Sequence, residues 1–182
     1  KKELEKAIDF KFGDKNLLIT FHPVTLERGT SEFQMNQLLA ALDKLSETHL
    51  IFTMPNADTE GRILFKIIKD YVKGNSKSVV YTSLGQLKYL SCMKNVDGVV
   101  GNSSSGLLEA PSFNIGTINI GDRQRGRLKA KSIIDCQPTK KSIYNATKKL
   151  YSTEFQESIK NVKNPYGSGG ACKKIVKCLE EM

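Results

Sequence analysis

The chain has no hydrophobic run that approaches the ~20 consecutive residues needed to cross a bilayer. Its start also lacks the pattern of a secretory signal, in which a basic stretch and an apolar stretch precede a small-residue cleavage site. These absences argue against a membrane protein. With 39% hydrophobic and 26% charged residues among 182, the composition is that of one globular domain with a sizeable core, which we expect in the cytoplasm.

The sequence also lacks the spacings with which proteins hold metal ions. Its cysteines form no Cys-x-x-Cys pair and lie near no histidine at ligand spacing. No Asp-x-Asp carboxylate cluster is present either. We therefore expect no bound metal, and free thiols in a reducing compartment. The four cysteines are Cys92, Cys136, Cys172 and Cys178, of which the last two are expected on different faces of one helix.

Negative charge is in short supply, because 28 lysines and arginines face 19 aspartates and glutamates, a formal net charge of +9. Such a balance is typical of nucleic-acid binding. The lysines, however, are scattered through predicted helices rather than gathered in one tract, which argues against a nucleic-acid partner. A basic surface balanced by an acidic segment outside this chain, or an anionic small ligand, accounts for the charge equally well.

Two common phosphate-binding motifs are absent, since neither a P-loop nor Gly-x-Gly-x-x-Gly occurs. Residues 101–109 instead read Gly-Asn-Ser-Ser-Ser-Gly-Leu-Leu-Glu after an apolar run, which predicts a strand, a tight turn and the start of a helix. The hydroxyls of Ser103 and Ser104 and the backbone N–H groups would favour an anion there. Glu109, one to two turns later, would suit a sugar hydroxyl. A serine helix cap without a ligand explains the same pattern.

Apolar runs and amphipathic stripes alternate along the chain with short connections. This alternation is the signature of βαβ units and predicts a Rossmann-like, three-layer α/β domain around a parallel sheet of about six strands. Strands are expected at 17–21, 50–54, 79–81, 99–100, 117–120 and 132–136. Helices are expected from the capping box at 31–34 to 42, and at 59–73, 86–95, 140–151 and 169–181. We expect residues 1–15 to be a linker or the end of a preceding segment, and 16–182 to be the domain.

Polar residues follow several of these strands, at the edge where parallel sheets bind ligands. His22 either fills a turn before Pro23 or presents an imidazole to a phosphate. The basic loop 121–127 is either solvated or offers the guanidinium of Arg123 to phosphate oxygens. Tyr89, on an amphipathic helix, is either a core residue or a platform for a base.

Together these segments resemble the hydrolysing UDP-N-acetylglucosamine 2-epimerases, and most closely the branch of bacterial sialic-acid and legionaminic-acid biosynthesis. The resemblance covers nearly the whole chain and is specific in the combination, order and spacing of its pieces. Those pieces are Phe-His-Pro-Val-Thr at 21–25, Met-Pro-Asn at 54–56, residues 101–111, residues 116–127 and Asn-Pro-Tyr-Gly at 164–167.

The resemblance implies a two-domain GT-B architecture with a sugar nucleotide in the cleft between Rossmann-like halves. This chain, which begins without Met, would be the C-terminal, UDP-holding half, and the absent N-terminal domain would carry the acidic proton-transfer residues. Such an enzyme eliminates UDP to leave a 2-acetamidoglycal and adds water to give the C2-epimerised free sugar. It would need no cofactor beyond its UDP-sugar substrate and would form a homo-oligomer, with no nucleic acid or membrane as partner.

The resemblance also assigns roles to individual residues. His22 matches the family histidine beside the diphosphate, and is the candidate catalytic residue. Ser103 and Ser104 match the hydroxyl pair that binds phosphate. Glu109 matches the carboxylate that accepts from the ribose hydroxyls, and Arg123 matches the arginine that reaches the nucleotide.

Two further positions complete the UDP-binding set. Tyr89 falls where the family places an aromatic residue, usually Phe, against the uracil, and Asn56 matches on the phosphate side. The closing turn departs from the family pattern, because Ser168 stands where an aspartate is common. The alternatives are a GT-B glycosyltransferase with the same nucleotide site and a non-catalytic module that senses a nucleotide.

Overall fold

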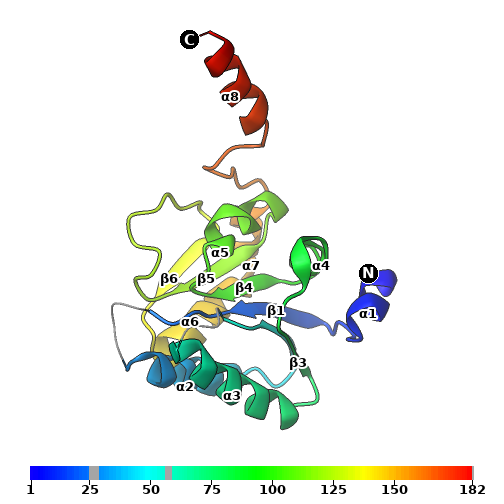
Figure 1. Ribbon diagram of the computed structural model, residues 1–182. Helices are drawn as coiled ribbons and strands as arrows, with labels where there is room; N and C mark the ends of the chain where they lie inside the picture. Colours follow the sequence, from blue (N-terminus) through cyan, green and yellow to red (C-terminus); the bar gives the residue numbers. More distant parts are fainter. Residues whose placement is uncertain (25–28, 56–58, 182) are drawn as a thin grey trace.

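A computed structural model describes residues 1–24, 29–55 and 59–181 (Figure 1). Its centre is a six-stranded sheet in which every neighbouring pair is parallel, in the order β3-β2-β1-β4-β5-β6. The chain starts in the middle of the sheet, runs out to one edge, returns, and runs out to the other. The strands are β1 (Lys15–Thr20), β2 (Thr48–Thr53), β3 (Ser78–Tyr81), β4 (Gly98–Gly101), β5 (Gly116–Ile120) and β6 (Ile133–Cys136).

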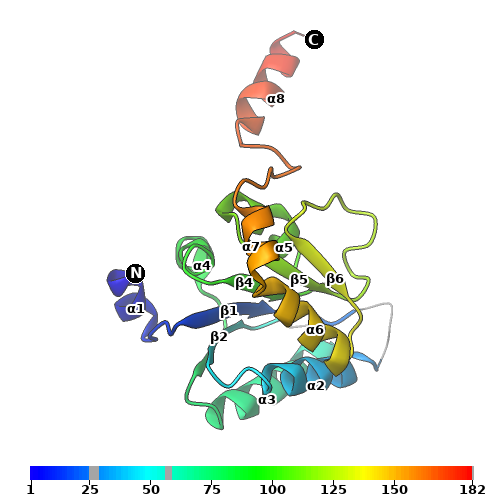
Figure 2. The same ribbon diagram turned by 180° about the vertical axis from the view of Figure 1, so that it is seen from behind.

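Helices cover both faces of the sheet, which gives the three layers predicted from the sequence (Figures 1 and 2). One face packs against α2, α3, α6 and α7, and the other against α1, α4 and η1. The helices are α1 (Lys2–Ile8), α2 (Ser31–Leu42), α3 (Thr59–Lys73), α4 (Gly85–Met93), α5 (Ser105–Leu108), the 3₁₀ helix η1 (Ala110–Phe113), α6 (Lys140–Leu150), α7 (Thr153–Ile159) and α8 (Ala171–Glu180).

The central strand shows why these runs form strands buried on two sides. Leu17 and Ile19 point into one hydrophobic cluster, and Leu18 between them points into the other. All three are at most 1% exposed, as expected for a parallel sheet with helices on both faces. The Rossmann-like fold predicted from the sequence is therefore confirmed.

The N-terminal segment, for which the sequence predicts a linker or the end of a preceding segment, contains a helix that packs on the domain. Ile8 at the end of α1 is 4% exposed and joins the cluster that includes Cys92 and Met93 of α4. The Tyr81 hydroxyl donates to the Ile8 carbonyl, and Lys88 Nζ donates to the Ala7 carbonyl at 3.1 Å. These contacts hold α1 against the sheet and α4.

The helix predicted after the serine-rich turn is a single turn long. Leu108 ends α5, and Pro111 falls at the start of η1. Proline has no N–H to continue the α-helical ladder and its ring clashes with the carbonyl four residues earlier, so the α-helix cannot run on. The chain turns through η1 and Asn114, which has a left-handed backbone (φ 55°), into β5.

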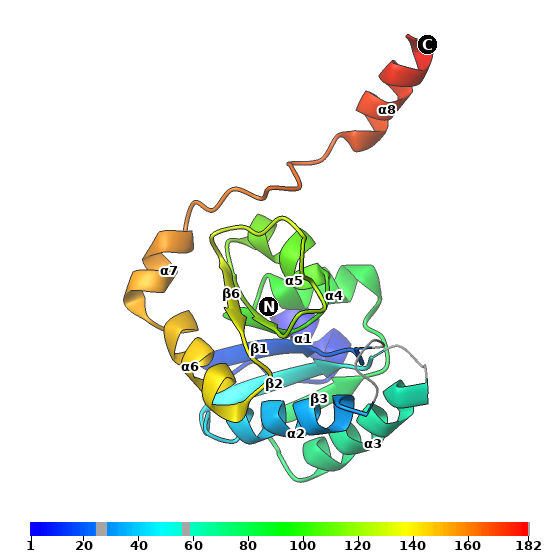
Figure 3. The same cartoon turned by 90° about the vertical axis from the view of Figure 1, so that its left-hand side faces the viewer.

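The last helix, α8, extends away from the rest of the domain (Figure 3). None of its residues is buried, and Ile175, Val176 and Leu179 are more than half exposed. Cys172 and Cys178 both lie on α8, as predicted. No helix in the described ranges is long and apolar enough to cross a membrane.

Candidate functional site

Parallel α/β sheets bind ligands in the crevice outside the carboxyl ends of the strands, at the point where the strand order reverses. In this sheet that point lies between β1 and β4. The two strands end side by side at Thr20 and Gly101. Gly101 has φ +139°, and a Cβ there would lie 2.0 Å from the Thr20 carbonyl oxygen. Only glycine allows the backbones to approach this closely. The serine-rich turn therefore leaves the sheet at a position that requires glycine.

Asn102, the next residue, ties this turn to the segment that follows β1. Its side chain is fully buried. The carboxamide Oδ1 accepts from the His22 backbone N–H at 2.7 Å, and Nδ2 donates to the His22 carbonyl at 2.8 Å. The backbone N–H of Asn102 also donates to the Thr20 carbonyl at 3.2 Å. The backbone of His22 is therefore held in place by the side chain of the residue that directly follows β4.

The carbonyl of the same residue ties in the loop after β5. It accepts from Arg123 Nη1 at 3.1 Å and from Gln124 Nε2 at 2.7 Å. Gln124 is 1% exposed, so it anchors the basic loop from below while Arg123 lies at the surface. The structure thus brings His22, the serine-rich turn and Arg123 to one edge of the sheet, from three different strands.

The hydroxyls of the serine-rich turn are only partly used by the fold. Ser104 is the N-cap of α5, yet its side chain makes no capping hydrogen bond. Ser103 Oγ accepts from the Ser105 backbone N–H at 3.4 Å, which is long. A serine cap alone therefore does not explain the pattern. Because α5 has only one turn, its dipole is small, and attraction for an anion must come from local N–H and O–H groups.

Tyr89 of α4 has features of both predicted roles, a core residue and a platform for a base. Its ring is partly buried against the second hydrophobic cluster, and its hydroxyl lies 2.8 Å from Ser105 Oγ. Burial raises the pKa of the phenol, so the hydroxyl stays protonated at neutral pH. The side chain both packs in the core and links α4 to the serine-rich turn.

Tyr89 also lines a pocket of about 440 Å³ at the carboxyl edge. The exposed carboxylate of Glu109 lines this pocket too, together with Ser103 and Ser105. Thr20 and Thr53 form part of its wall, and their hydroxyls are 2.6 Å apart. The pocket thus combines one aromatic side chain, one carboxylate and a row of hydroxyls. Asn56, the remaining residue of the predicted set, lies outside the described residues.

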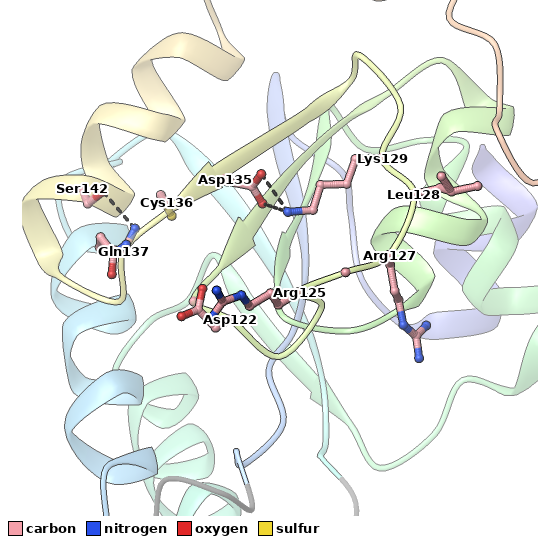
Figure 4. Close-up of a pocket in the computed structure, with 11 residues that line it drawn as sticks. Asp122, Arg125, Arg127, Leu128, Lys129, Asp135, Cys136, Gln137 and Ser142 are labelled. Carbon is pink, nitrogen blue, oxygen red and sulfur yellow. Dashed lines mark hydrogen bonds and ion pairs between the residues drawn. The ribbon is translucent and has the colours of Figure 1, made fainter.

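The basic loop 121–127 divides its side chains between two places. Arg123 is bonded to Asn102, whereas Arg125 and Arg127 line a separate hollow of about 630 Å³ beside β6 (Figure 4). In that hollow Lys129 Nζ lies 2.8 Å from Asp135 Oδ1, and Arg127 points away from this pair. Of these three arginines, Arg123 is therefore the one that the structure ties to the serine-rich turn, through the Asn102 carbonyl.

Sequence reasoning missed three anchoring residues of this region. Asn102 and Gln124 are recognisable only when β1, β4 and β5 are seen side by side. Asn164 is the third: its Nδ2 donates to the Leu108 carbonyl at 2.8 Å and to Ser112 Oγ at 2.7 Å. The Asn-Pro-Tyr-Gly turn thereby supports α5 and η1 from outside. Only Asn102 carried a signal in the sequence, as an amide side chain directly after an apolar run, and that signal did not reveal its partner.

Comparison with known proteins agrees with the resemblance seen in the sequence. The family model for UDP-N-acetylglucosamine 2-epimerase matches residues 1–180. The chain is 44% identical over 184 residues to the GDP/UDP-N,N'-diacetylbacillosamine 2-epimerase (hydrolyzing) of Campylobacter jejuni, covering 100% of this chain and 47% of that protein. It is 34% identical to polysialic acid biosynthesis protein P7 of Escherichia coli, covering 97% of this chain and 46% of that protein.

Solved structures show the same fold. An S. aureus MnaA structure with UDP superposes with a TM-score of 0.76 at 18% identity, over 100% of this chain and 48% of that one. The Methanocaldococcus jannaschii UDP-GlcNAc 2-epimerase with UDP-GlcNAc and UDP gives 0.76 at 18% identity, over 100% and 49%. The C-terminal domain of a group 1 glycosyl transferase from Francisella tularensis gives 0.60 at 14% identity, over 90% and 88%.

The chain spans about half the length of the curated relatives it matches. Its fold is that of one Rossmann-like half of the GT-B architecture, as the resemblance implies. Since the family model covers all but the last two of the 182 residues, the chain belongs to the UDP-N-acetylglucosamine 2-epimerase family.

Proposed function

We propose that this chain is the C-terminal, UDP-binding half of a hydrolysing 2-epimerase that acts on UDP-N-acetylglucosamine or a UDP-diacetamido sugar. The observation that carries the proposal is the convergence on Asn102 of His22, the serine-rich turn and Arg123 at the crevice between β1 and β4. Similar proteins crystallised with UDP or UDP-GlcNAc, and relatives named as hydrolysing 2-epimerases, support it.

In this proposal the diphosphate lies against the serine-rich turn. The hydroxyls of Ser103 and Ser104 donate to phosphate oxygens, as do backbone N–H groups of the turn. The guanidinium of Arg123, anchored through Nη1 on the Asn102 carbonyl, presents a planar fork of donors that suits two phosphate oxygens. His22 faces the same anion from the β1 side, and the resemblance adds Asn56 to the phosphate-binding set.

The uridine would occupy the pocket beside the turn. Glu109 accepts hydrogen bonds from the ribose hydroxyls, and the ring of Tyr89 packs against the uracil. The pocket of about 440 Å³ has room for these groups and already contains both side chains in its wall. Positive groups at the turn and a carboxylate on the ribose side would fix which end of the nucleotide lies at each end of the site.

The proposed reaction needs a domain that stabilises the negative charge developing on the leaving diphosphate. A base removes the C2 proton, the C1–O bond breaks, and UDP leaves with the electron pair of that bond. The sugar is left as the 2-acetamidoglycal, and water then adds OH at C1 and H at C2 on the opposite face. Donors aimed at the diphosphate stabilise the transition state because charge grows there. His22 and Arg123 would do this, and the proton-transfer residues would belong to the other half of the protein.

The same proposal sets the partners of the chain. It would need no metal or further cofactor, because the diphosphate charge is met by His22, Arg123 and the serine-rich turn. The other half of the same polypeptide would close the cleft, and the whole enzyme would be a cytoplasmic homo-oligomer. The sugar would be read largely by that other half, and the relatives named for diacetylbacillosamine favour a diacetamido substrate.

Titration of the chain with UDP by calorimetry tests the binding part of the proposal. Glu109→Ala and Arg123→Ala should each weaken binding by about 1.5–3 kcal/mol, because each removes a hydrogen bond to a charged group. This corresponds to a loss of affinity of roughly 10- to 150-fold. Glu154→Ala on α7 and Arg127→Ala, which lines the other hollow, are matched controls and should change the affinity less than about twofold. Equal losses in the controls would contradict the assignment.

A product assay separates the epimerase from a GT-B glycosyltransferase, whose C-terminal domain shares this fold. The full-length protein with a UDP-sugar and no acceptor should release UDP and the C2-epimerised free sugar. The chain alone should bind UDP and release no sugar, because the proposal assigns the proton-transfer residues to the other half of the protein. Turnover only after addition of an acceptor would favour the transferase, and steady sugar release by the chain alone would contradict the division of labour.

A further inference from the structure

We propose that Asn102 is a positioning residue that joins His22 and Arg123 into a single anion site. Its side chain fixes the backbone of one, and its carbonyl fixes the guanidinium of the other. The inference deepens the proposed UDP binding and rests on it. It assigns to Asn102 a role through these two groups rather than contact with the nucleotide itself.

The chemistry of the side chain is specific to this task. The ladder between β1 and β4 ends at Thr20 and Gly101, so His22 lies beyond the last paired residue of its strand. A carboxamide carries both an acceptor and a donor, and Asn102 uses one on each backbone group of His22. The Asn102 side chain thereby gives His22 the two hydrogen bonds that the backbone of a neighbouring strand would otherwise provide. An aspartate of the same shape accepts from the N–H but cannot donate to the carbonyl.

The carbonyl of Asn102 holds the loop after β5 in the same way as its side chain holds His22. Arg123 Nη1 and Gln124 Nε2 both donate to it, and Gln124 is buried below the loop. A rotation of the Asn102 peptide would therefore move His22 and Arg123 together. Because a diphosphate must meet both groups at once, a small displacement of either should weaken binding at the site as a whole.

The chain contains a matched control for this geometry. Asn16 makes the same pair of bonds with the backbone of Gly13, accepting from its N–H at 2.9 Å and donating to its carbonyl at 3.0 Å. It is 4% exposed and lies at the start of β1, at the opposite edge of the sheet from the crevice. A purely structural cost of breaking such a pair should appear at both positions, whereas a positioning effect should appear at Asn102 alone.

The test compares Asn102→Asp with Asn16→Asp in the same chain. Both should lower the melting temperature, because each leaves a part-buried carbonyl without its donor. Asn102→Asp should also weaken UDP binding at least about tenfold, the effect of one charge-assisted hydrogen bond. Asn16→Asp should leave the affinity within about twofold at a temperature where both variants are folded. Similar affinities for both variants would overturn the proposal.

A double-mutant cycle separates positioning from a general loosening of the site. In a His22→Ala background, Asn102→Asp should cost only about threefold in UDP affinity, because one of the groups it positions is gone. An undiminished loss in that background means that the two residues act independently, and the proposal fails. If Asn102→Asp does not fold, Gln124→Met, which removes only the second donor to the Asn102 carbonyl, takes its place with Arg123→Ala as the background.

A measurement without ligand keeps the two proposals distinguishable. Asn102→Ala should speed amide hydrogen exchange at His22 at least about tenfold, since it removes the acceptor that protects this N–H. Asn16→Ala should leave that rate unchanged. If the unmodified chain binds no UDP, the proposed function fails, and the exchange rate at His22 still decides whether Asn102 fixes this segment. An unchanged rate overturns the positioning role whatever the outcome with UDP.

Discussion

At the scale of single residues, the site depends on one position that accepts no side chain. A Cβ on Gly101 would overlap the Thr20 carbonyl oxygen at 2.0 Å, and neither partner is the flexible end of a side chain. The clash would force apart β1 and β4 at the point where they form the crevice. Backbone sterics, and not the ligand, therefore determine the residue that opens the serine-rich turn.

Gly101→Ala should lower the free energy of unfolding by about 3 kcal/mol or more, because it combines an unfavourable φ with a clash between backbones. Urea denaturation followed by circular dichroism measures the change. Gly169→Ala serves as the control, since its φ is also positive (+98°) but no atom lies within 4 Å of the added Cβ. It should cost about 1 kcal/mol. Equal costs at the two positions would show that the close approach is absent.

The cysteines offer a second prediction at this scale. Burial raises the pKa of the Cys92 thiol to about 11 and that of Cys136 to about 12, the latter with the help of the Asp135 charge. Since only the thiolate reacts with iodoacetamide, both should be protected in the native protein at pH 8. Cys172 and Cys178 are exposed and should be alkylated first, as read by mass spectrometry. Rapid labelling of Cys92 without denaturant would contradict its burial.

At the scale of secondary-structure elements, one hydrogen bond joins α4 to the serine-rich turn. The Tyr89 hydroxyl lies 2.8 Å from Ser105 Oγ, and the ring packs between the helix and the pocket. The bond restrains the turn at Ser105, whereas Asn102 restrains it at its start. The turn is thus held at two points although α5 itself has only one turn.

Tyr89→Phe should destabilise the fold by about 1 kcal/mol, the usual net value of a buried hydrogen bond. The affinity for UDP should change little, because the aromatic ring remains in the pocket wall. Thermal denaturation and calorimetry on the same samples give the two values. Ser105→Ala combined with Tyr89→Phe should cost about as much as either change alone; additive costs would mean that the two hydroxyls do not interact.

Asp97, before β4, gives an element-scale prediction with a defined pH dependence. Burial raises the pKa of its carboxyl, against the opposing hydrogen bond from the Asn16 N–H at 2.6 Å. The folded chain therefore holds this proton more tightly than the unfolded chain does. The resulting stabilisation is fully present below the ordinary pKa of aspartate and is lost as pH rises through the raised value.

Asp97→Asn removes the charge and keeps an acceptor for Asn16. The variant should be more stable than the parent at pH 7, and the difference should shrink as the pH falls through the region where Asp97 takes up its proton. Urea midpoints at several pH values between 3 and 7 measure it. A variant whose advantage grows on acidification would show that the charged form is the one favoured by the fold.

The elements themselves were largely predictable, for a physical reason. Strands buried on two sides are continuous apolar runs, as in residues 17–21, and helices such as α3 carry one clear apolar stripe. The exceptions are short. Only Phe155 and Ile159 of α7 are buried, too few to mark a helix, and α5 is a single turn that ends ahead of Pro111. Asn102 and Gln124 could not be predicted as anchors, because their partners are distant in sequence and adjacent only once the strand order is known.

At the scale of the whole molecule, the domain and its last helix are energetically separate. α8 contributes no buried residue and stands apart from the sheet in all three views (Figures 1–3). α7, by contrast, places Phe155 and Ile159 in the main core. The packed part of the described chain therefore ends between these two helices.

Removal of residues 171–182 should change the free energy of unfolding of the domain by less than about 0.5 kcal/mol, since no buried contact is lost. Removal from residue 153 onward should cost several kcal/mol, because two buried hydrophobic side chains leave the core. Urea denaturation of the two truncated chains measures both changes. A large loss on removal of α8 alone would contradict the separation.

The pairing of β1 with β4 has a consequence for how the molecule comes apart. Leu17 pairs with Gly98 although the two residues are far apart in the sequence. The β1–β4 pairing is therefore the boundary between an N-terminal unit, β1 to β3, and a C-terminal unit, β4 to β6. His22 belongs to the first unit, while Ser103 and Arg123 belong to the second. A ligand that contacts all three residues would bind across the boundary between the two units. It would slow their separation and stabilise their assembly.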